Sequence, residues 1–180
     1  MIKKKILIIC GEFIPCTQSI GGVIRLISFL KSLKRHELKL ITLKKKYYGY
    51  FGFKNYCNHV KKEYLGEFKN NQNVFIKIIL LIFKFFFSNI LYITGIDQNF
   101  FNQKLYFEAV EKSLLKFKPD FILISAPPFS LFRIVNKIRK VDNKVNIILD
   151  YRDGWTKRVK SSKFFFINKI MNKVEKQILE

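Results

Sequence analysis

The sequence predicts an α/β fold in which helices flank a parallel sheet, and two observations lead to this prediction. Four short apolar runs rich in β-branched residues occur along the chain, at residues 4–10, 38–43, 121–125 and 145–150. Runs of this length and composition are typical of strands that are buried on both faces. A loop and a helical pattern separate the first run from the second and the third from the fourth, which is the order of a parallel sheet with right-handed crossovers.

Apolar residues at three- and four-residue spacing predict helices at residues 23–36, 98–117, 130–140 and 163–180. Asp97 is expected to be the N-cap of the second helix and Ser130 that of the third. The buried stripe of the second helix is expected to include Phe107 and Val110. The last helical pattern continues to the final residue without a capping signal, which favours the front part of a longer protein over a natural terminus.

Two stretches of the predicted single domain, residues 1–180, do not fit this repeat. Residues 44–73 are basic, aromatic and broken by glycine, and we expect an irregular excursion there. Residues 74–93 are strongly apolar, but Lys77 and Lys84 interrupt them, and each lysine would cost about 2.5–3.5 kcal/mol near a bilayer centre. A helix packed against the domain is favoured over a helix in a membrane interface, and both are favoured over a membrane span.

The net charge of the chain restricts the classes of partner that it is expected to bind. Thirty-four basic and 13 acidic residues give a net charge of +21, and the lysines are scattered rather than clustered. This pattern argues against a nucleic-acid partner, whereas an anionic membrane surface or an anionic small substrate fits it. The three cysteines form no CxxC pair and, with two histidines, no metal-binding spacing, which fits a reducing cytoplasm. The dinucleotide fingerprint GxGxxG and the P-loop pattern are absent, which disfavours a dehydrogenase and an NTPase.

Polar residues follow the predicted strands at the edge where an open parallel sheet binds ligands. After the first strand come Glu12 and the pair Gly21–Gly22, and the pair precedes a helix whose first turn carries Arg25. Glycines there let a phosphate approach the free N–H groups, and Arg25 could add a charged contact. A plain turn that leads into the helix is the competing interpretation, and Glu12 could equally be a solvated loop residue.

The third and fourth strands bring further candidates to the same edge. Ser125 and Ser130 follow the third strand and could contact a substrate. The fourth strand ends in the stretch "DYRDGW", which contains Asp150, Arg152, Asp153 and Trp155. The two aspartates could act as a general base or hold a sugar hydroxyl, and Arg152 could orient an acid or a phosphate. An internal Asp–Arg ion pair is the alternative for Arg152, and simple packing is the favoured role for Trp155.

Three stretches together resemble family 4 glycosyltransferases of the GT-B fold. "KILIICGEFIPCTQSIGGVIRLISFLKSL" resembles the opening strand, "GEFxPxxxxxGG" loop and helix of that family. "KPDFILISAPPFSLFRIVNKIRK" and "NIILDYRDGW" resemble its later "PDxIxxSxPP" and "DxRDxW" segments. The resemblance extends from residue 5 to about residue 155 with the motifs in the family's order. It implies a Rossmann-like domain that forms the N-terminal, acceptor-side half of a GT-B architecture.

The resemblance also implies an activity: retaining transfer of a sugar from a nucleotide-sugar to a polysaccharide or lipid-linked acceptor. No metal or cofactor is expected, because helix termini and basic residues neutralise the diphosphate leaving group in such enzymes. By position, Gly21 and Gly22 match the loop that reaches the donor phosphates. Asp153 or Arg152 falls where relatives place a catalytic or acceptor-contacting residue, although relatives with a histidine there differ from this sequence.

The family's donor-binding C-terminal domain has no counterpart in these 180 residues. We therefore expect the isolated chain to be inactive without a donor domain, which a partner chain could supply. We expect a cytoplasmic protein, peripheral on the inner leaflet, where lysines and aromatic residues would contact anionic lipid. The alternatives are a non-catalytic basic α/β module that binds an anionic membrane, and a truncated gene product without selected activity.

Overall fold

The computed structural model describes residues 2–14, 17, 20–44, 57–67, 102–151, 173 and 175–176. Its elements in chain order are β1 (Lys5–Cys10), α1 (Ile20–Ser32), β2 (Glu37–Lys44), β3 (Val60–Glu67), α3 (Gln103–Lys116), β4 (Phe121–Ala126), the 3₁₀ helix η3 (Phe129–Arg133), α4 (Ile134–Val141) and β5 (Asn146–Tyr151). The predicted apolar helix at 74–93 lies outside the described residues, as does nearly all of the predicted helix at 163–180.

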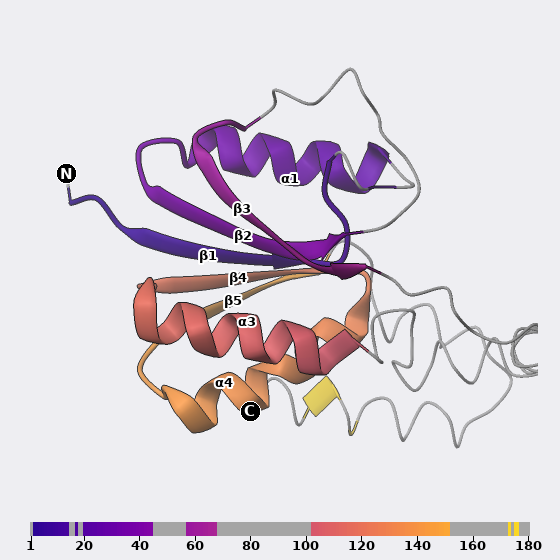
Figure 1. The fold of residues 1–180 in the computed structure, drawn as a ribbon, viewed down its shortest axis with the longest axis vertical. Helices are drawn as coiled ribbons and strands as arrows, with labels where there is room; N and C mark the ends of the chain where they lie inside the picture. The colour runs from indigo at the N-terminus through magenta and orange to yellow at the C-terminus, as the bar shows by residue number, and fades with distance from the viewer. Residues whose placement is uncertain are drawn as a thin grey trace, which may run out of the picture.

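The five strands form one all-parallel sheet in the order β3-β2-β1-β4-β5. Helix α1 covers one face of the sheet, and α3 and α4 cover the other (Figure 1). Strand β1 lies in the middle of the sheet. Strands β2 and β3 follow on one side of it, and β4 and β5 follow on the other side. This confirms the prediction of a Rossmann-like α/β fold.

Alternation along the strands builds a separate apolar core on each face of the sheet. In β1, Ile6 and Ile8 pack on the α1 side, and Leu7 and Ile9 pack on the α3 and α4 side. Because both faces are covered, the run is apolar throughout instead of alternating with polar residues. Each fully buried Leu or Ile contributes about 1.5–3 kcal/mol relative to an exposed one.

Two helices begin elsewhere than predicted. Helix α1 starts at Ile20, three residues before the predicted position, so Gly21 and Gly22 lie inside its first turn. Helix α3 starts at Gln103 after Asn102, whose side chain makes no capping hydrogen bond, and Asp97 lies outside the described residues. The buried stripe of α3 contains the predicted Val110, but the fully buried aromatic is Tyr106 rather than Phe107.

The prediction for Ser130 as a helix cap was wrong. Ser130 lies inside η3 and is fully buried, and α4 begins only at Ile134 with Arg133 as its N-cap residue. The physical reason is that the chain forms a tighter 3₁₀ turn directly after Pro128, which precedes the α-helical hydrogen bonding.

Strand β3 was missed by the sequence analysis, which expected irregular structure throughout 44–73. Residues 60–67 instead pair with β2 as an edge strand, and the other parts of that stretch, 45–56 and 68–73, lie outside the described residues. The strand lacks an apolar run because Lys61 and Glu63 occupy alternate positions on one face. Its periodicity signal is therefore weak. Among the helices in the described ranges, none is both long and apolar enough to cross a membrane.

Candidate functional site

The carboxyl ends of three neighbouring strands bring polar side chains together on the α1 side of the sheet. The strand register aligns Cys10 of β1 with Ser125 of β4, and Ser125 with Asp150 of β5. Ser125 Oγ donates a hydrogen bond to Asp150 Oδ2 at 2.9 Å. Arg25 of α1 reaches the same carboxylate, with Nη2 2.6 Å from Oδ1. The structure therefore brings Ser125 and Asp150, which were both expected at this edge, together with Arg25 of α1.

Asp150 is engaged at both of its carboxylate oxygens, and its side chain is only 7% exposed. A buried carboxylate that accepts one charged and one neutral hydrogen bond is held rigidly in place. It is therefore suited to fixing the position of Arg25 rather than to accepting a proton from a substrate.

Arg25 retains an exposed surface despite this ion pair. Its side chain is 47% exposed, and the guanidinium carbon lies 5.5 Å from the centre of the Phe29 ring. A guanidinium carries five N–H donors, and Asp150 takes only part of that capacity. The arrangement can present a positively charged donor to an anion at the carboxyl edge of the sheet.

The first turn of α1 is open beside Arg25. A Cβ added at Gly21 would meet no atom within 4 Å, and Gly21 is exposed. The first turn of α1 carries no acidic side chain. The backbone N–H groups of a first helical turn and the positive end of the helix dipole would suit a ligand with negative charge.

The loop after β1 is braced by internal hydrogen bonds. Glu12 accepts a hydrogen bond from Thr17 Oγ1 at 3.1 Å, and Thr17 is fully buried. The hydroxyl of Tyr106, which sequence analysis did not single out, donates to the carbonyl of Cys10 at 2.9 Å, and the hydroxyl of Tyr64 donates to the carbonyl of Ile14 at 2.8 Å. Through its hydrogen bond with Thr17, Glu12 therefore helps to hold the loop after β1 in shape.

The remaining candidates fall elsewhere. Ser130 is buried beneath the α3 side, where its carbonyl accepts a hydrogen bond from Gln103 Nε2 at 3.1 Å, so it does not join the cluster at the edge. Arg152, Asp153 and Trp155 lie outside the described residues. Within the described ranges no group of three His, Cys, Asp or Glu side chains could hold a metal ion.

No protein-family model matches the chain, and no curated protein matches it. The class of protein that the fold and the edge cluster define is an α/β protein with a five-stranded, all-parallel, Rossmann-like sheet.

Proposed function

We propose that this chain is the acceptor-binding N-terminal domain of a glycosyltransferase with GT-B architecture. In that role it takes part in retaining transfer of a sugar from a nucleotide-sugar to a cell-envelope polysaccharide or a lipid-linked acceptor. The observation that carries the proposal is the cluster of Arg25, Ser125 and Asp150 beside the open first turn of α1. The ordered likeness to family 4 motifs supports it from the sequence.

The proposed chemistry is electrostatic. Departure of a nucleoside diphosphate places negative charge on the leaving group, and donors already oriented toward that charge lower the barrier. Gly21 and Gly22 would offer backbone N–H groups, and Arg25 would add a guanidinium held in place by Asp150 and Ser125. Asp153 and Arg152 stay predictions for the catalytic or acceptor-contacting position.

The phosphate-binding role of the edge cluster is tested by calorimetric titration of the chain with a nucleoside diphosphate, the leaving group that Gly21, Gly22 and Arg25 are proposed to contact. Arg25→Gln should weaken binding by about tenfold or more, as expected for loss of a charge-assisted contact of about 1.4 kcal/mol or more. Arg35→Gln is the matched control, because Arg35 is also exposed but lies past the far end of α1. It should change binding less than about twofold. Equal effects of the two substitutions, or the absence of saturable binding, would refute the proposal.

The need for a donor domain has its own test. The isolated 180-residue chain should not turn over nucleotide-sugars, whereas turnover by the purified chain would refute this part of the proposal. Addition of a donor-domain chain should be required for activity.

A second candidate is a non-catalytic basic module on an anionic membrane, for which the net charge of +21 is the specific observation. Ile24 and Phe29 of α1, 53% and 37% exposed, would add apolar contact with lipid. Each lysine near such a surface contributes about 1 kcal/mol.

A cytoplasmic, peripheral location on the inner leaflet belongs to both candidates. Equal flotation with neutral and anionic vesicles would count against membrane binding, and alanines at residues 150–153 should leave it unchanged if the module is non-catalytic.

A further inference from the structure

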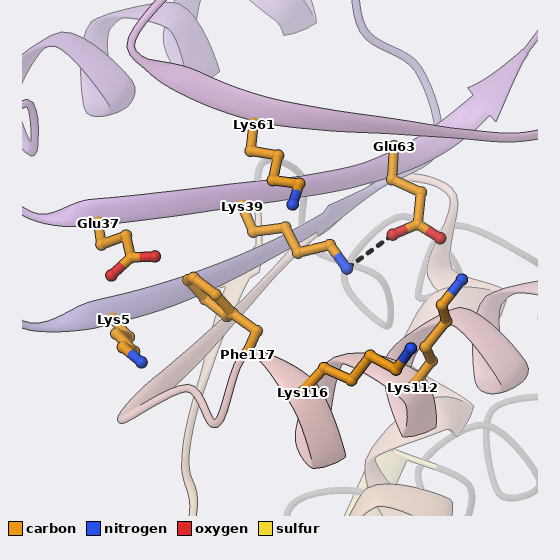
Figure 2. Close-up of a pocket in the computed structure, with 8 residues that line it drawn as sticks. All are labelled: Lys5, Glu37, Lys39, Lys61, Glu63, Lys112, Lys116 and Phe117. Carbon is orange, nitrogen blue, oxygen red and sulfur yellow. Dashed lines mark ion pairs between the residues drawn. The ribbon is translucent and has the colours of Figure 1, made fainter.

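A cavity of about 370 Å³ lies at the opposite end of the sheet from the Arg25 cluster, between the amino-terminal halves of the strands and the last turns of α3. Figure 2 shows its lining side chains, which come from β1, β2, β3 and the end of α3. They are Lys5, Glu37, Lys39, Lys61, Glu63, Lys112, Lys116 and Phe117. Five lysines against two glutamates give the lining an excess of three positive charges.

The cavity exists because the sheet face beneath α3 changes character along its strands. In β2 the side chains on this face are Glu37 and Lys39, followed by the buried Ile41 and Leu43. Strand β3 changes in the same way along its length. Lys61, which pairs in register with Lys39, lies at its charged end, and Leu65 further along the strand belongs to the apolar core. A parallel sheet face under a helix is ordinarily apolar. Charged residues have therefore replaced an apolar core at this end.

Lys39 forms a fixed, buried charge on the floor of the cavity. It is 8% exposed, and its Nζ lies 2.7 Å from Glu63 Oε2 and donates to Ser113 Oγ at 2.7 Å. A buried ammonium needs such partners, because an unpaired charge in a low-dielectric site is very costly. Glu63 is occupied by Lys39 and does not compensate the other lysines of the lining.

Three further lysines are available to a ligand. Lys61 on β3 and Lys112 and Lys116 on α3 are exposed, and none of them pairs with a carboxylate of the described residues. Figure 2 shows them around the Lys39–Glu63 pair, with Lys61 on the side of the sheet and Lys112 and Lys116 on the side of the helix. On the other side, Lys5 lies with its ammonium 5.8 Å from the centre of the Phe117 ring. Glu37 also lines the cavity, but the five lysines still outnumber the two glutamates, and the net positive charge favours an anionic ligand.

We propose that this cavity binds a compact anion that carries phosphate groups, either a soluble polyphosphate or the head group of an anionic lipid. Lysines bind phosphate as flexible point charges. The lining contains no arginine, the residue that binds a planar carboxylate through bidentate hydrogen bonds. The volume suits a small ligand. A single aromatic ring offers no series of stacking surfaces for a nucleic-acid strand. The proposal is independent of the glycosyl-transfer proposal, which concerns the other edge of the sheet.

Calorimetric titration of the full chain with inorganic pyrophosphate tests the site. Saturable binding is expected, and the double variant Lys61→Gln/Lys112→Gln should weaken it by about tenfold or more, since two charge-assisted contacts are lost. The control Lys34→Gln/Lys140→Gln removes the same charge at exposed positions outside the cavity and should change the Kd less than about twofold. The titrations are repeated in the Arg25→Gln background, so that pyrophosphate bound at the edge cluster is not counted as binding to the cavity.

Flotation with phosphatidylglycerol and phosphatidylcholine vesicles tells whether the cavity binds a lipid head group or a soluble polyphosphate. If the cavity takes lipid head groups, the Lys61/Lys112 variant loses flotation with phosphatidylglycerol, and pyrophosphate competes with the vesicles. If it takes a soluble anion, the variant loses pyrophosphate binding but keeps the flotation of the unmodified chain. The single variant Lys112→Gln, at an exposed helical position, serves if the double variant does not fold. Equal weakening in cavity and control variants, or no saturable binding to either probe, would overturn the proposal.

Discussion

Arg25 of α1 and Asp150 of β5 form an ion pair at 2.6 Å although 125 residues separate them in the chain. The pair joins α1 to the carboxyl end of β5, and Ser125 of β4 donates a hydrogen bond to the second oxygen of the same carboxylate. This contact closes the carboxyl edge of the sheet and sets the direction of the guanidinium. Its strength is therefore the first property to measure.

The Arg25–Asp150 pair should show measurable coupling in a double-mutant cycle. Asp150→Asn should lower the free energy of unfolding by about 1–2 kcal/mol, because a buried carboxylate loses a charged hydrogen bond. Arg25→Gln should cost less, about 0.5–1 kcal/mol, since its side chain is 47% exposed and screened by water. Urea unfolding of both single variants and the double variant should give a coupling of about 0.5–1 kcal/mol.

The surface pair Lys104–Glu108 is the control for that cycle. Its atoms are 3.9 Å apart and its side chains are 87% and 56% exposed. The cycle with Lys104→Gln and Glu108→Gln should give a coupling below about 0.5 kcal/mol. Equal coupling in the two cycles would show that Arg25 and Asp150 do not act as a distinct pair.

The effect of the Lys39–Glu63 pair on the free energy of unfolding should come from the burial of Lys39 rather than from net attraction between the two charges. Glu63→Gln should destabilise the chain by about 1–3 kcal/mol, because Lys39 is left in a low-dielectric site without its carboxylate. The double variant Lys39→Met/Glu63→Leu should recover at least half of that loss, since no buried charge remains and Ser113 Oγ still donates to the carbonyl of Ala109 at 2.7 Å. Urea midpoints measure both; a double variant no more stable than the single would contradict this account.

Asp120 should make stability depend on acid pH. The hydrogen bond from the Lys5 N–H, 2.8 Å from Oδ2, followed by the nearby charge of Lys4, lowers the pKa of Asp120 below its ordinary 3.8. The charged form is thus favoured in the folded state. Its contribution is present above the unfolded pKa and is lost as the pH falls through the lowered folded pKa. Asp120→Asn should therefore lose less stability than the wild type from about pH 6 to about pH 3.

Urea midpoints at the two pH values are the measurement for Asp120. Asp142→Asn is the control, because it removes a carboxylate from another loop and leaves Asp120 intact, so it should keep the wild-type loss. An Asp120→Asn variant with the full wild-type loss would contradict the assignment.

Lys118 should be a site where glycine stabilises the chain. It follows α3 with φ +51°, and its N–H donates to the carbonyl of Ser113 at 3.0 Å. A left-handed backbone costs a lysine about 1–2 kcal/mol that glycine avoids. After the loss from glycine's greater freedom in the unfolded chain, Lys118→Gly should gain about 0.5–1 kcal/mol. Thermal unfolding should show a Tm higher by a few degrees. Lys116→Gly, inside the helix, should instead lower the stability by about 1 kcal/mol.

The sequence by itself determined the class of the fold. Residues 6–10 and 121–124 are apolar without interruption, and this local pattern is enough to predict strands buried on both faces. Their alternation with helical patterns predicted the parallel sheet, and the position of polar residues after the strands predicted that Ser125 and Asp150 would lie at the same edge. These properties follow from periods of two and 3.6 residues, which are visible in a single segment.

Only the tertiary structure decided which charges are paired and which face a cavity. Lys39 is buried because β3 lies beside β2 in a register that carries Glu63 within 2.7 Å, and β3 itself has no local signal strong enough to predict it. Likewise, Asp150 binds Arg25 because the strand order places β5 beside β4, with the carboxyl end of β5 within reach of Arg25 on α1. Contacts of this kind depend on the register and order of strands far apart in the chain. A residue's own neighbours carry little information about them.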